Sequence, residues 1–395
     1  MKIREWTKPS RQVNICATRG PAALSPARRK RPESMKITRL RRLPLSIPLP
    51  RPIPSAKTII KSIDCLAVFL DTDEGLAGEG LVFTLNGLRL PVLDQMIASF
   101  EPLVVGTDPG MGGAFVSRAW ADTAFLGRPG VTAVGLAAID MALWDLRGKA
   151  AGMNVSRMLG AYRDALPVYR SNGLRLSAGI DQIQAEAEAF IEQGFRAIKM
   201  SLGMPSMDDD VARVRAVREA IGPDIMLMAD CNQQFTAPQA IRLGRRLEEY
   251  GLAWIEEPVP SRDHAAEAAV AAALDTPIAS GENEYTSAGM FDMLRQGSAD
   301  ILMPDMQRMG GPTEVVKAVL LAEAFKVPVS PHLFSEMTLS LAAGLPNVMI
   351  VEYVAWFENL YSSRVELDGE GRAKVPAGPG WGMTFDPDAL ARFAV

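Results

Sequence analysis

Short apolar segments alternate with longer amphipathic segments through the second half of the chain. Between the apolar segments, hydrophobic residues recur at spacings of three and four, which is typical of helices with one buried face. Strands that are apolar throughout are buried on both faces, as in parallel sheets. The alternation predicts an α/β fold in which parallel strands and helices close into a barrel. The apolar segments lie within residues 166–173, 196–203, 225–232, 252–258, 277–284, 299–307, 327–334 and 348–354.

The main alternative to a barrel is a doubly wound open sheet. That fold predicts a phosphate-binding glycine turn after its first strand. The stretch SNGLRLSAG at residues 171–179 does not carry this fingerprint, so the barrel is favoured.

The first half of the chain has a different pattern, which predicts a separate α+β domain. Residues 63–80 alternate as in a β-hairpin with its turn near Gly75. The proline-rich residues 41–56 break every regular pattern, so we expect a mobile loop there that would suit a lid. Helical spacing is found in residues 90–104, 112–125 and 132–152.

These patterns predict the domain boundaries. Residues 1–34 are basic and contain no apolar signal-peptide core, and Met35 opens a natural-looking N-terminus. We expect residues 1–34 to be a disordered extension or a start-site artefact. The alternative with a specific function is an arm that binds nucleic acid. We expect the α+β domain at 35–162, the barrel at 163–352 and a C-terminal segment at 353–395 that packs back on the first domain.

Composition narrows the classes of function. The 395-residue chain has a net charge of −4, so no basic field recruits nucleic acid or an anionic membrane. Cys16, Cys65 and Cys231 are too few and too widely spaced for a disulfide framework or a zinc cluster, which fits a reducing cytoplasm. No apolar run reaches the roughly 18 residues of a membrane span. We expect a cytoplasmic protein.

Seven ionisable residues occupy the carboxyl ends of successive predicted strands. Catalytic groups lie at this end of the strands in barrels of this kind. The gaps between the seven are 31, 26, 26, 23, 27 and 20 residues, each about one strand plus one helix. We therefore expect all seven side chains to meet at one mouth of the barrel. They are Lys199, Asp230, Glu256, Glu282, Asp305, His332 and Glu352.

Three of these residues, Asp230, Glu256 and Glu282, form a candidate metal site. One carboxylate after a strand is most often a helix cap or a solvated charge, and on that interpretation Asp230 would cap a turn and Glu257 beside Glu256 would be a surface charge. Three acids in phase on consecutive strands repel one another unless a cation lies among them. Carboxylate oxygens with room for water and substrate suit octahedral Mg²⁺.

His332 is a candidate proton carrier. Asp305 ends the preceding predicted strand, and an aspartate beside a histidine fixes its tautomer and raises its pKa. The second histidine, His264, lies among alanines at an expected helix start. We expect it at the surface.

The order of these motifs resembles that of the enolase superfamily, in particular its mandelate racemase-like subgroup of acid-sugar dehydratases and racemases. The resemblance runs from about Met35 to the C-terminus and is strongest for dehydratases of the talarate/galactarate type. It implies a modified TIM-like (β/α)₇β barrel with an α+β capping domain. The matching stretches are KMS, MADCNQ, WIEEP, ASGE, LMPDMQRMGG, SPHLF and IVEY, with capping-domain signatures in GLAAIDMALWDLRGKAAG and PAGPGWGM.

The resemblance also implies roles for single residues. It assigns one Mg²⁺ to the three acids of the candidate metal site and the general base to the pair Asp305 and His332. Glu352 would hydrogen-bond the substrate carboxylate on the side opposite the metal. Lys199 would stabilise that carboxylate as it becomes an enediolate, and Asn232 would help to position the substrate.

Ser201 departs from the family pattern. On a strand, Lys199 and Ser201 face the same side and Met200 faces the other. Family members with a lysine at the second position use it as a base on the substrate face opposite the histidine. Serine has no usable pKa and is too short for that role, although it can still leave room for a substrate hydroxyl or hydrogen-bond to it. Only His332 remains as a base, so direct proton transfer between enantiomers is disfavoured.

We therefore expect a Mg²⁺-dependent hydro-lyase that removes water from an aldonic or aldaric acid by α-proton abstraction and β-elimination, giving a 2-keto-3-deoxy acid. Two alternatives stay open: a racemase or epimerase with another second base, such as Arg170 or Arg89, and a decayed ligand-binding homologue. Arg41, Arg42, Arg51 and Arg89 are candidates for the far end of the substrate. The resemblance also implies a homo-oligomer, a tetramer or an octamer.

Overall fold

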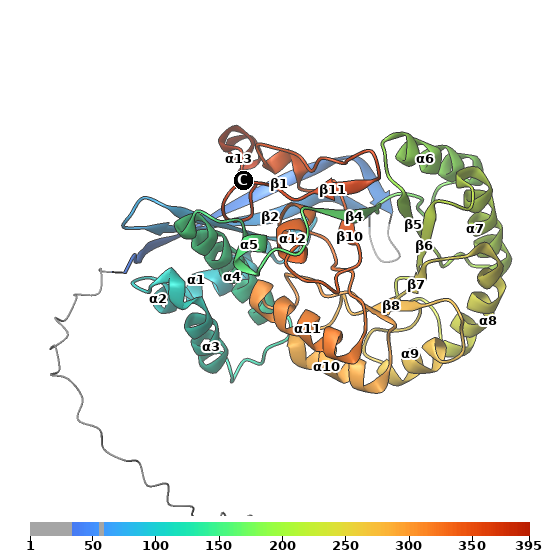
Figure 1. The fold of residues 1–395 in the computed structure, drawn as a ribbon, viewed down its shortest axis with the longest axis horizontal. Coiled ribbons are helices and arrows are strands. Elements are labelled where there is room, and N and C mark those ends of the chain that lie inside the picture. The colour runs from blue at the N-terminus through green and yellow to red at the C-terminus, as the bar shows by residue number, and fades with distance from the viewer. Residues whose placement is uncertain (1–33, 55–58) are drawn as a thin grey trace, which may run out of the picture. The chain divides into compact units, whose positions relative to one another are not determined.

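The computed structural model describes residues 34–54 and 59–395, and Met35–Val395 form one compact unit. The expectations for residues 1–34 therefore fall on a segment of which only Ser34 is described. Figure 1 shows the fold.

The first sheet is antiparallel and has three strands in the order β1-β2-β3. The hairpin prediction is confirmed, because β2 (Ile59–Thr72) and β3 (Ala77–Leu85) pair across a short turn. Gly75 in this turn has a φ of 80°, a conformation that favours glycine.

Residues 41–54 are not the mobile loop that their prolines suggested. They belong to β1 (Ile37–Pro54), which pairs antiparallel with β2. β1 lies at the edge of the sheet, where the missing N–H of a proline leaves no neighbouring strand unpaired. Leu45 in the middle of β1 is fully buried, so hydrophobic packing also holds the segment. The lid interpretation is wrong for these residues, and residues 55–58 lie outside the described part.

The helices of the first half pack on this sheet at close range. A Cβ added at Gly78 or Gly80 of β3 would lie 2.1 Å from a carbonyl oxygen of the longest helix, so glycine permits the contact. The helical prediction is confirmed, with a break at Phe100. The helices are α1 (Leu90–Ser99), α2 (Glu101–Val104), η1 (Pro109–Met111), α3 (Gly112–Asp122), α4 (Val131–Ala151) and α5 (Val155–Met158).

The second sheet is parallel and closes into the predicted barrel. Its strands run in the order β10-β4-β5-β6-β7-β8-β9. Single parallel bridges from Leu302 to Val329 and from Val329 to Val348 fill the remaining place between β9 and β10. The strands are β4 (Ala165–Arg170), β5 (Ala197–Ser201), β6 (Met226–Asp230), β7 (Trp254–Glu256), β8 (Ile278–Ser280), β9 (Ile301–Leu302) and β10 (Val351–Tyr353).

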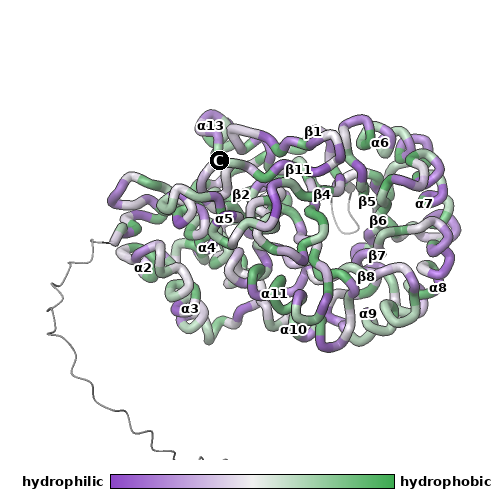
Figure 2. The backbone as a smooth tube through the Cα atoms, viewed as in Figure 1, coloured by the Kyte–Doolittle hydropathy of each residue, from purple (hydrophilic) through white to green (hydrophobic). Residues whose placement is uncertain are grey.

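Seven helices connect these strands, and no helix follows the eighth strand position before the chain leaves the barrel. Figure 1 shows α6 to α11 around the outside of the strands, and Figure 2 shows hydrophilic colour along outer helices such as α8. The helices are α6 (Ile180–Glu192), α7 (Met207–Ile221), α8 (Ala237–Leu247) with η2 (Glu248–Tyr250), α9 (His264–Ala271), α10 (Thr286–Gln296), α11 (Pro312–Phe325) and α12 (Ser335–Ala342).

An apolar layer of side chains fills the barrel beneath its mouth. Because side chains on a strand alternate, the residue two positions later on each strand points into the same interior. Lys199 follows Ala197 in this way, and Asp230, Glu256 and Glu352 follow their own strand's member of the layer. The charged residues therefore form the next layer up. The apolar layer consists of Tyr169, Ala197, Met228, Trp254, Ala279, Ile301, Met303 and Ile350.

The C-terminal segment contacts the first half of the chain. It contains η3 (Glu358–Leu360), β11 (Arg372–Lys374) and α13 (Pro387–Phe393). The Trp381 backbone N–H donates to Asp145 of α4 at 2.9 Å, and its indole N–H donates to the Met141 carbonyl at 3.2 Å. No helix among the described residues is long and apolar enough to span a membrane.

Candidate active site

The strand register brings the predicted residues to one end of the barrel. Ser201 is the pairing partner of Asp230, and Asp230 is the partner of Glu256 on the next strand. A single bridge pairs Asp305 with His332. Met200, between Lys199 and Ser201, is buried in the separate core outside the barrel interior, as alternation predicts.

Lys199 lies among three carboxyl groups. Its Nζ is 2.5 Å from Glu256, 3.2 Å from Glu352 and 3.6 Å from Asp230. Burial lowers the pKa of this lysine, but the charges of these acids outweigh burial and raise the pKa well above its ordinary value. Lys199 is therefore a cation at neutral pH.

The acids of the candidate metal site carry more negative charge than Lys199 offsets. Burial raises the pKa of Asp230 and Glu256, and repulsion from Glu282 and Glu352 adds to the effect. No set of three or more His, Cys, Asp or Glu side chains in the described ranges is already gathered around a metal position. The ammonium group of Lys199 instead lies against two of the three acids. Their carboxylate oxygens and unbalanced charge fit a hard divalent cation.

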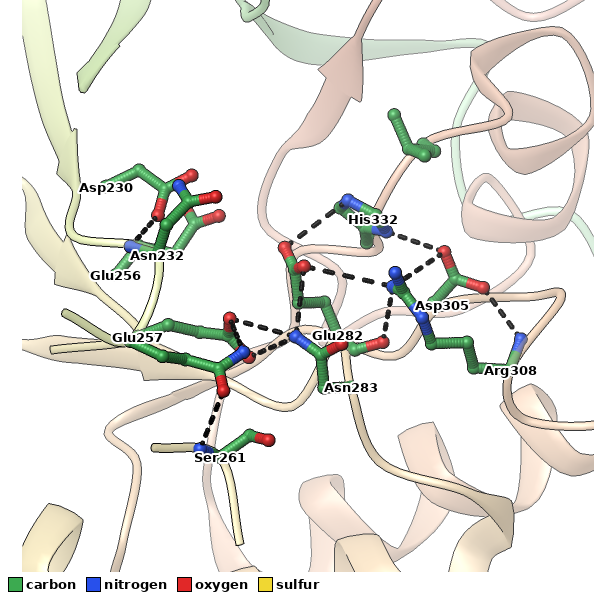
Figure 3. Close-up of polar contacts among 12 residues, drawn as sticks. Asp230, Asn232, Glu256, Glu257, Ser261, Glu282, Asn283, Asp305, Arg308 and His332 are labelled. Carbon is green, nitrogen blue, oxygen red and sulfur yellow. Dashed lines mark hydrogen bonds and ion pairs between the residues drawn. The ribbon is translucent and has the colours of Figure 1, made fainter. Parts of the chain in front are cut away.

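His332 lies between two carboxyl groups (Figure 3). Its Nδ1 is 2.6 Å from Asp305, and its Nε2 is 3.3 Å from Glu282. Burial opposes ionisation of the ring, but Glu282, Glu352 and Asp305 together raise the pKa of His332 to about 9. Burial raises the pKa of Asp305, yet Arg308 and His332 outweigh it, and the net shift is downward. Asp305 is therefore an anion that fixes the ring through Nδ1.

Glu352 connects the two sides of the site. Its carboxylate contacts Lys199 at 3.2 Å and His332 at 3.8 Å, and it accepts a hydrogen bond from the Leu333 N–H at 2.9 Å. Burial opposes ionisation, but the cations Lys199 and His332 lower the pKa of Glu352 to about 2. The group is therefore ionised at neutral pH. A substrate carboxylate beside it would be repelled unless a shared proton or a nearby cation offsets the two negative charges.

Two other predicted residues, Ser201 and Asn232, form hydrogen bonds through their backbone N–H groups. The Ser201 N–H donates to the Leu174 carbonyl at 3.3 Å, and no described residue hydrogen-bonds to its hydroxyl group. Asn232 is exposed, and its N–H donates to Asp230 at 2.8 Å. The side-chain amide of Asn232 is thus free to meet a bound molecule.

Glu257 is not the surface charge that the simple interpretation of a carboxylate after a strand suggested. The side chain is buried and accepts hydrogen bonds from Asn283 at 2.8 and 2.9 Å and from Gln233 at 2.8 Å. Burial, with repulsion from Glu282, raises its pKa to about 8. Glu257 has a φ of 38°, and this left-handed turn directs it inward beside Glu256. The only sequence signal was the pair of adjacent glutamates.

Arg308 was also missed. Its Nη1 donates to the Glu282 carbonyl at 2.8 Å, and its guanidinium lies 3.6 Å from Asp305. Its own N–H donates to Asp305 at 2.7 Å. Arg308 therefore positions both neighbours of His332. The signal was its place three residues after Asp305.

Arg175 is a third residue that sequence reasoning missed. It follows Leu174, a bulky residue with an unusual φ of 50°, whose carbonyl accepts from Ser201. Burial lowers the pKa of Arg175, and the charges of Asp230, Glu186 and Glu352 act against that shift. The guanidinium of Arg175 therefore lies in the electric field of the site acids Asp230 and Glu352.

The candidate second bases do not join the site. Arg170 is the outward-facing residue of β4, and its guanidinium stacks on Phe190 and Tyr353. Arg89 is exposed and precedes α1. His264 begins α9 as predicted, but its Nε2 lies 3.0 Å from Glu284 and its side chain is 15% exposed. The expectation of a surface histidine is therefore wrong.

Comparisons with known proteins agree with the architecture. Residues 39–160 match the mandelate racemase / muconate lactonizing enzyme N-terminal domain, and residues 182–389 match the enolase C-terminal domain-like family. The chain is 33% identical over 353 residues to the L-talarate/galactarate dehydratase of Salmonella typhimurium, covering 87% of each chain. It is 31% identical over 350 residues to the 3,6-anhydro-alpha-L-galactonate cycloisomerase of Streptomyces coelicolor, covering 88% of this chain and 97% of that relative.

Solved structures give the same result. An L-talarate dehydratase from a Polaromonas species, complexed with Mg and L-glucarate, superposes with a TM-score of 0.87 at 36% identity, covering 91% of this chain and 97% of that chain. The predicted fold class, a (β/α)₇β barrel with an α+β capping domain, is confirmed. The chain belongs to the enolase superfamily, within its mandelate racemase / muconate lactonizing enzyme family.

Proposed function

We propose that this protein is a Mg²⁺-dependent dehydratase of an aldonic or aldaric sugar acid. The observation that carries the proposal is the single histidine base, held by Asp305 on one side of the mouth, with Lys199 and Glu352 beside it. The product would be a 2-keto-3-deoxy acid. The dehydratases among the relatives support this reaction class.

Asp230, Glu256 and Glu282 would hold the metal ion. Their oxygen donors and uncompensated charge support this assignment, as do solved neighbours with bound magnesium. Bound Mg²⁺ acts as a Lewis acid that makes the α-proton of a carboxylic acid more acidic. Its binding is tested apart from activity by titration calorimetry, in which Glu256→Gln should weaken Mg²⁺ binding. Unchanged affinity would remove Glu256 from the ligand set.

His332 would remove the α-proton with Nε2. Asp305 accepts the Nδ1 proton at 2.6 Å, which leaves Nε2 directed to the mouth beside Glu282. With a pKa of about 9 the ring is protonated at neutral pH in the metal-free protein. Neutralisation of the Glu282 charge would lower that pKa towards the range in which a base works.

Lys199 would stabilise the negative charge that develops on the substrate. Its ammonium group is buried, already charged and held by Glu256 at one end of the mouth. A preorganised cation of this kind needs little rearrangement as an enediolate forms. The proton taken by His332 can then go to the departing β-hydroxyl, so one residue serves as base and acid when both groups leave from the same face.

The absence of a second base at Ser201 supports elimination over racemisation. Substrate incubated in D₂O should not acquire deuterium faster than it dehydrates. Rapid exchange accompanied by racemisation would indicate a second base and contradict the proposal.

The sharpest test is the variant His332→Asn. Removing a general base should lower the dehydration rate by about 10²-fold or more. The matched control is His264→Asn, which changes the other histidine and should leave the rate near that of the wild type. A panel of mono- and diacid sugars assayed for 2-keto acids would identify the substrate. Near-full activity of His332→Asn would contradict the mechanism.

A cycloisomerase or racemase is the second candidate. It is favoured by relatives that include two cycloisomerases, at 31% and 30% identity, and by the buried guanidinium of Arg175 in the field of Asp230 and Glu352. A racemase predicts no 2-keto acid from the acid-sugar panel and an isomerised acid instead, whereas a cycloisomerase predicts an isomerised product from a lactone or an anhydro acid, as the names of those relatives state. A decayed ligand-binding protein predicts neither product. The homo-oligomer, tetramer or octamer, also remains a prediction, which sedimentation analysis would test.

A further inference from the structure

A cavity of about 480 Å³ lies on the outer side of the barrel. It is lined by the outward residues at the ends of β4 and β10, by Phe195 after α6, and by the C-terminal segment at residues 355–367. Seven helices connect the eight strand positions of the described barrel, so no connecting helix lies between β10 and β4. The C-terminal segment covers that place incompletely. The volume is within the range of small-molecule sites, about 300–1,000 Å³.

Arg170 gives the cavity a fixed cation. Its guanidinium carbon lies 5.1 Å from the ring centre of Phe190, 5.8 Å from that of Phe195 and 5.2 Å from that of Tyr353. No described residue accepts a hydrogen bond from Arg170 or forms an ion pair with it within 4.0 Å, and its Nε is buried without a partner. Stacking on three rings holds the planar group in place. Its donors are thus available to a bound molecule.

The other charges of the cavity are already engaged with one another. Glu358 accepts from the Tyr353 hydroxyl at 2.8 Å and lies 3.9 Å from Arg364. Glu186, which also faces the region of Arg170, accepts from the Leu174 N–H at 2.8 Å. Within the lining, two arginines and one glutamate leave a balance of one positive charge. That balance matches one carboxylate, whereas Glu358 would repel a dianionic phosphate.

We propose that this cavity binds a small carboxylic acid with an apolar body. The carboxylate would pair with the fork of Arg170, which matches its geometry. Val365, Leu367 and Phe195 would contact the apolar part. The site is separate from the active site, because Arg170 and Tyr353 face away from the barrel interior that Glu352 faces. The inference therefore does not depend on the proposed function.

The test is titration calorimetry with benzoate on the full chain in EDTA, so that metal-dependent binding at the mouth does not contribute. Benzoate should bind once per chain with a Kd of about 1 mM or tighter. Benzamide, the neutral isostere, should bind at least about tenfold more weakly because it lacks the charge. Inorganic phosphate should also bind at least about tenfold more weakly, because it lacks the apolar body. Absence of saturable benzoate binding to the wild type would overturn the proposal, and tighter binding of phosphate would overturn the ligand class.

Two variants assign the site to this cavity. Arg170→Met should weaken benzoate binding about tenfold or more, as loss of a charge-assisted pair does, and Val365→Trp should block the cavity without touching the cation. Arg372→Met on β11, an arginine outside the lining, is the matched control and should bind as the wild type does. Urea denaturation checks that each variant is folded. If Arg170→Met does not fold, Val365→Trp decides, and wild-type affinity in a folded Val365→Trp protein contradicts the assignment.

Discussion

The ammonium group of Lys199 is the one lysine nitrogen among the described residues that lies within 4.0 Å of three different carboxyl groups. Removal of one partner from a buried ionic group leaves the remaining charges uncompensated. We expect Lys199→Met to lower the free energy of unfolding by about 3–5 kcal/mol. Mg²⁺ should restore part of this loss, since the same acids would then hold a cation. Urea denaturation with and without Mg²⁺ measures both effects.

The control for this prediction is Lys374→Met. Lys374 pairs with Glu366 at 3.2 Å on the surface, where both side chains are more than half exposed. Exposed pairs contribute little to stability, so this variant should unfold close to the wild type. Equal losses in the two variants, or no response of Lys199→Met to Mg²⁺, would contradict the charge balance described for the site.

The residues that sequence predicted best are those fixed by strand alternation. Lys199, Asp230 and Glu256 each follow an interior apolar residue by two positions, so their direction is a property of the strand. Glu257 and Arg175 were missed because their direction depends on loop backbone, with left-handed φ values at Glu257 and at Leu174. Such values are not visible in a hydrophobic pattern.

At the scale of elements, β1 is the part that sequence predicted worst. Its prolines argued for a loop, yet proline is tolerated at a sheet edge, and whether a strand is an edge strand depends on the whole sheet. We expect Leu45→Ala to lower the free energy of unfolding by about 2–5 kcal/mol, the usual cost of a large-to-small change in a core. Arg39→Ala, an exposed position of the same strand, is the control. Equal stability of the two variants in urea would favour the loop.

Helix α9 carries a buried carboxyl group that gives stability a pH dependence. Glu267 is fully buried, and neither oxygen has a hydrogen-bond partner among the described residues. Burial raises its pKa to about 8, and the nearby Ser280 hydroxyl offsets the shift only in part. Between the ordinary pKa of about 4.5 and the folded value, the folded state binds more protons than the unfolded state. The stability contributed by this group is thus complete at low pH and is lost as pH rises towards 8.

Glu267→Gln removes that titration. Compared with the wild type, the variant should gain stability as pH rises from 5 to 8, by at most about 1.4 kcal/mol per pH unit. Urea denaturation of both proteins at several pH values measures the difference. Glu366→Gln, which changes an exposed glutamate, should give a difference that hardly varies with pH. A constant difference for Glu267→Gln as well would mean that Glu267 is ionised in the folded protein.

At the scale of the whole molecule, Asp145 of α4 joins the first sheet to the C-terminal segment. Its carboxylate accepts from the Trp381 N–H and from the Glu79 N–H, each at 2.9 Å, and pairs with Lys149 at 2.6 Å. A nearby helix residue, Asp140, accepts from Thr313 after β9 at 2.8 Å. One helix, α4, therefore links the first sheet, the barrel and the C-terminal segment. Loss of the contact with the C-terminal segment should lower the stability of the whole unit.

Gly380→Ala tests this link. Gly380 has a φ of 69°, and a Cβ there would lie 2.0 Å from an Asp145 carboxylate oxygen. A side chain at a left-handed position is strained, and the clash also displaces a buried acceptor. We expect a loss of about 2 kcal/mol or more in the free energy of unfolding, from strain and one broken buried hydrogen bond together. Gly369→Ala in the same segment is the matched control, because nothing lies within 4 Å of its added Cβ. If both variants unfold at the same urea concentration, the C-terminal segment does not stabilise the unit through α4.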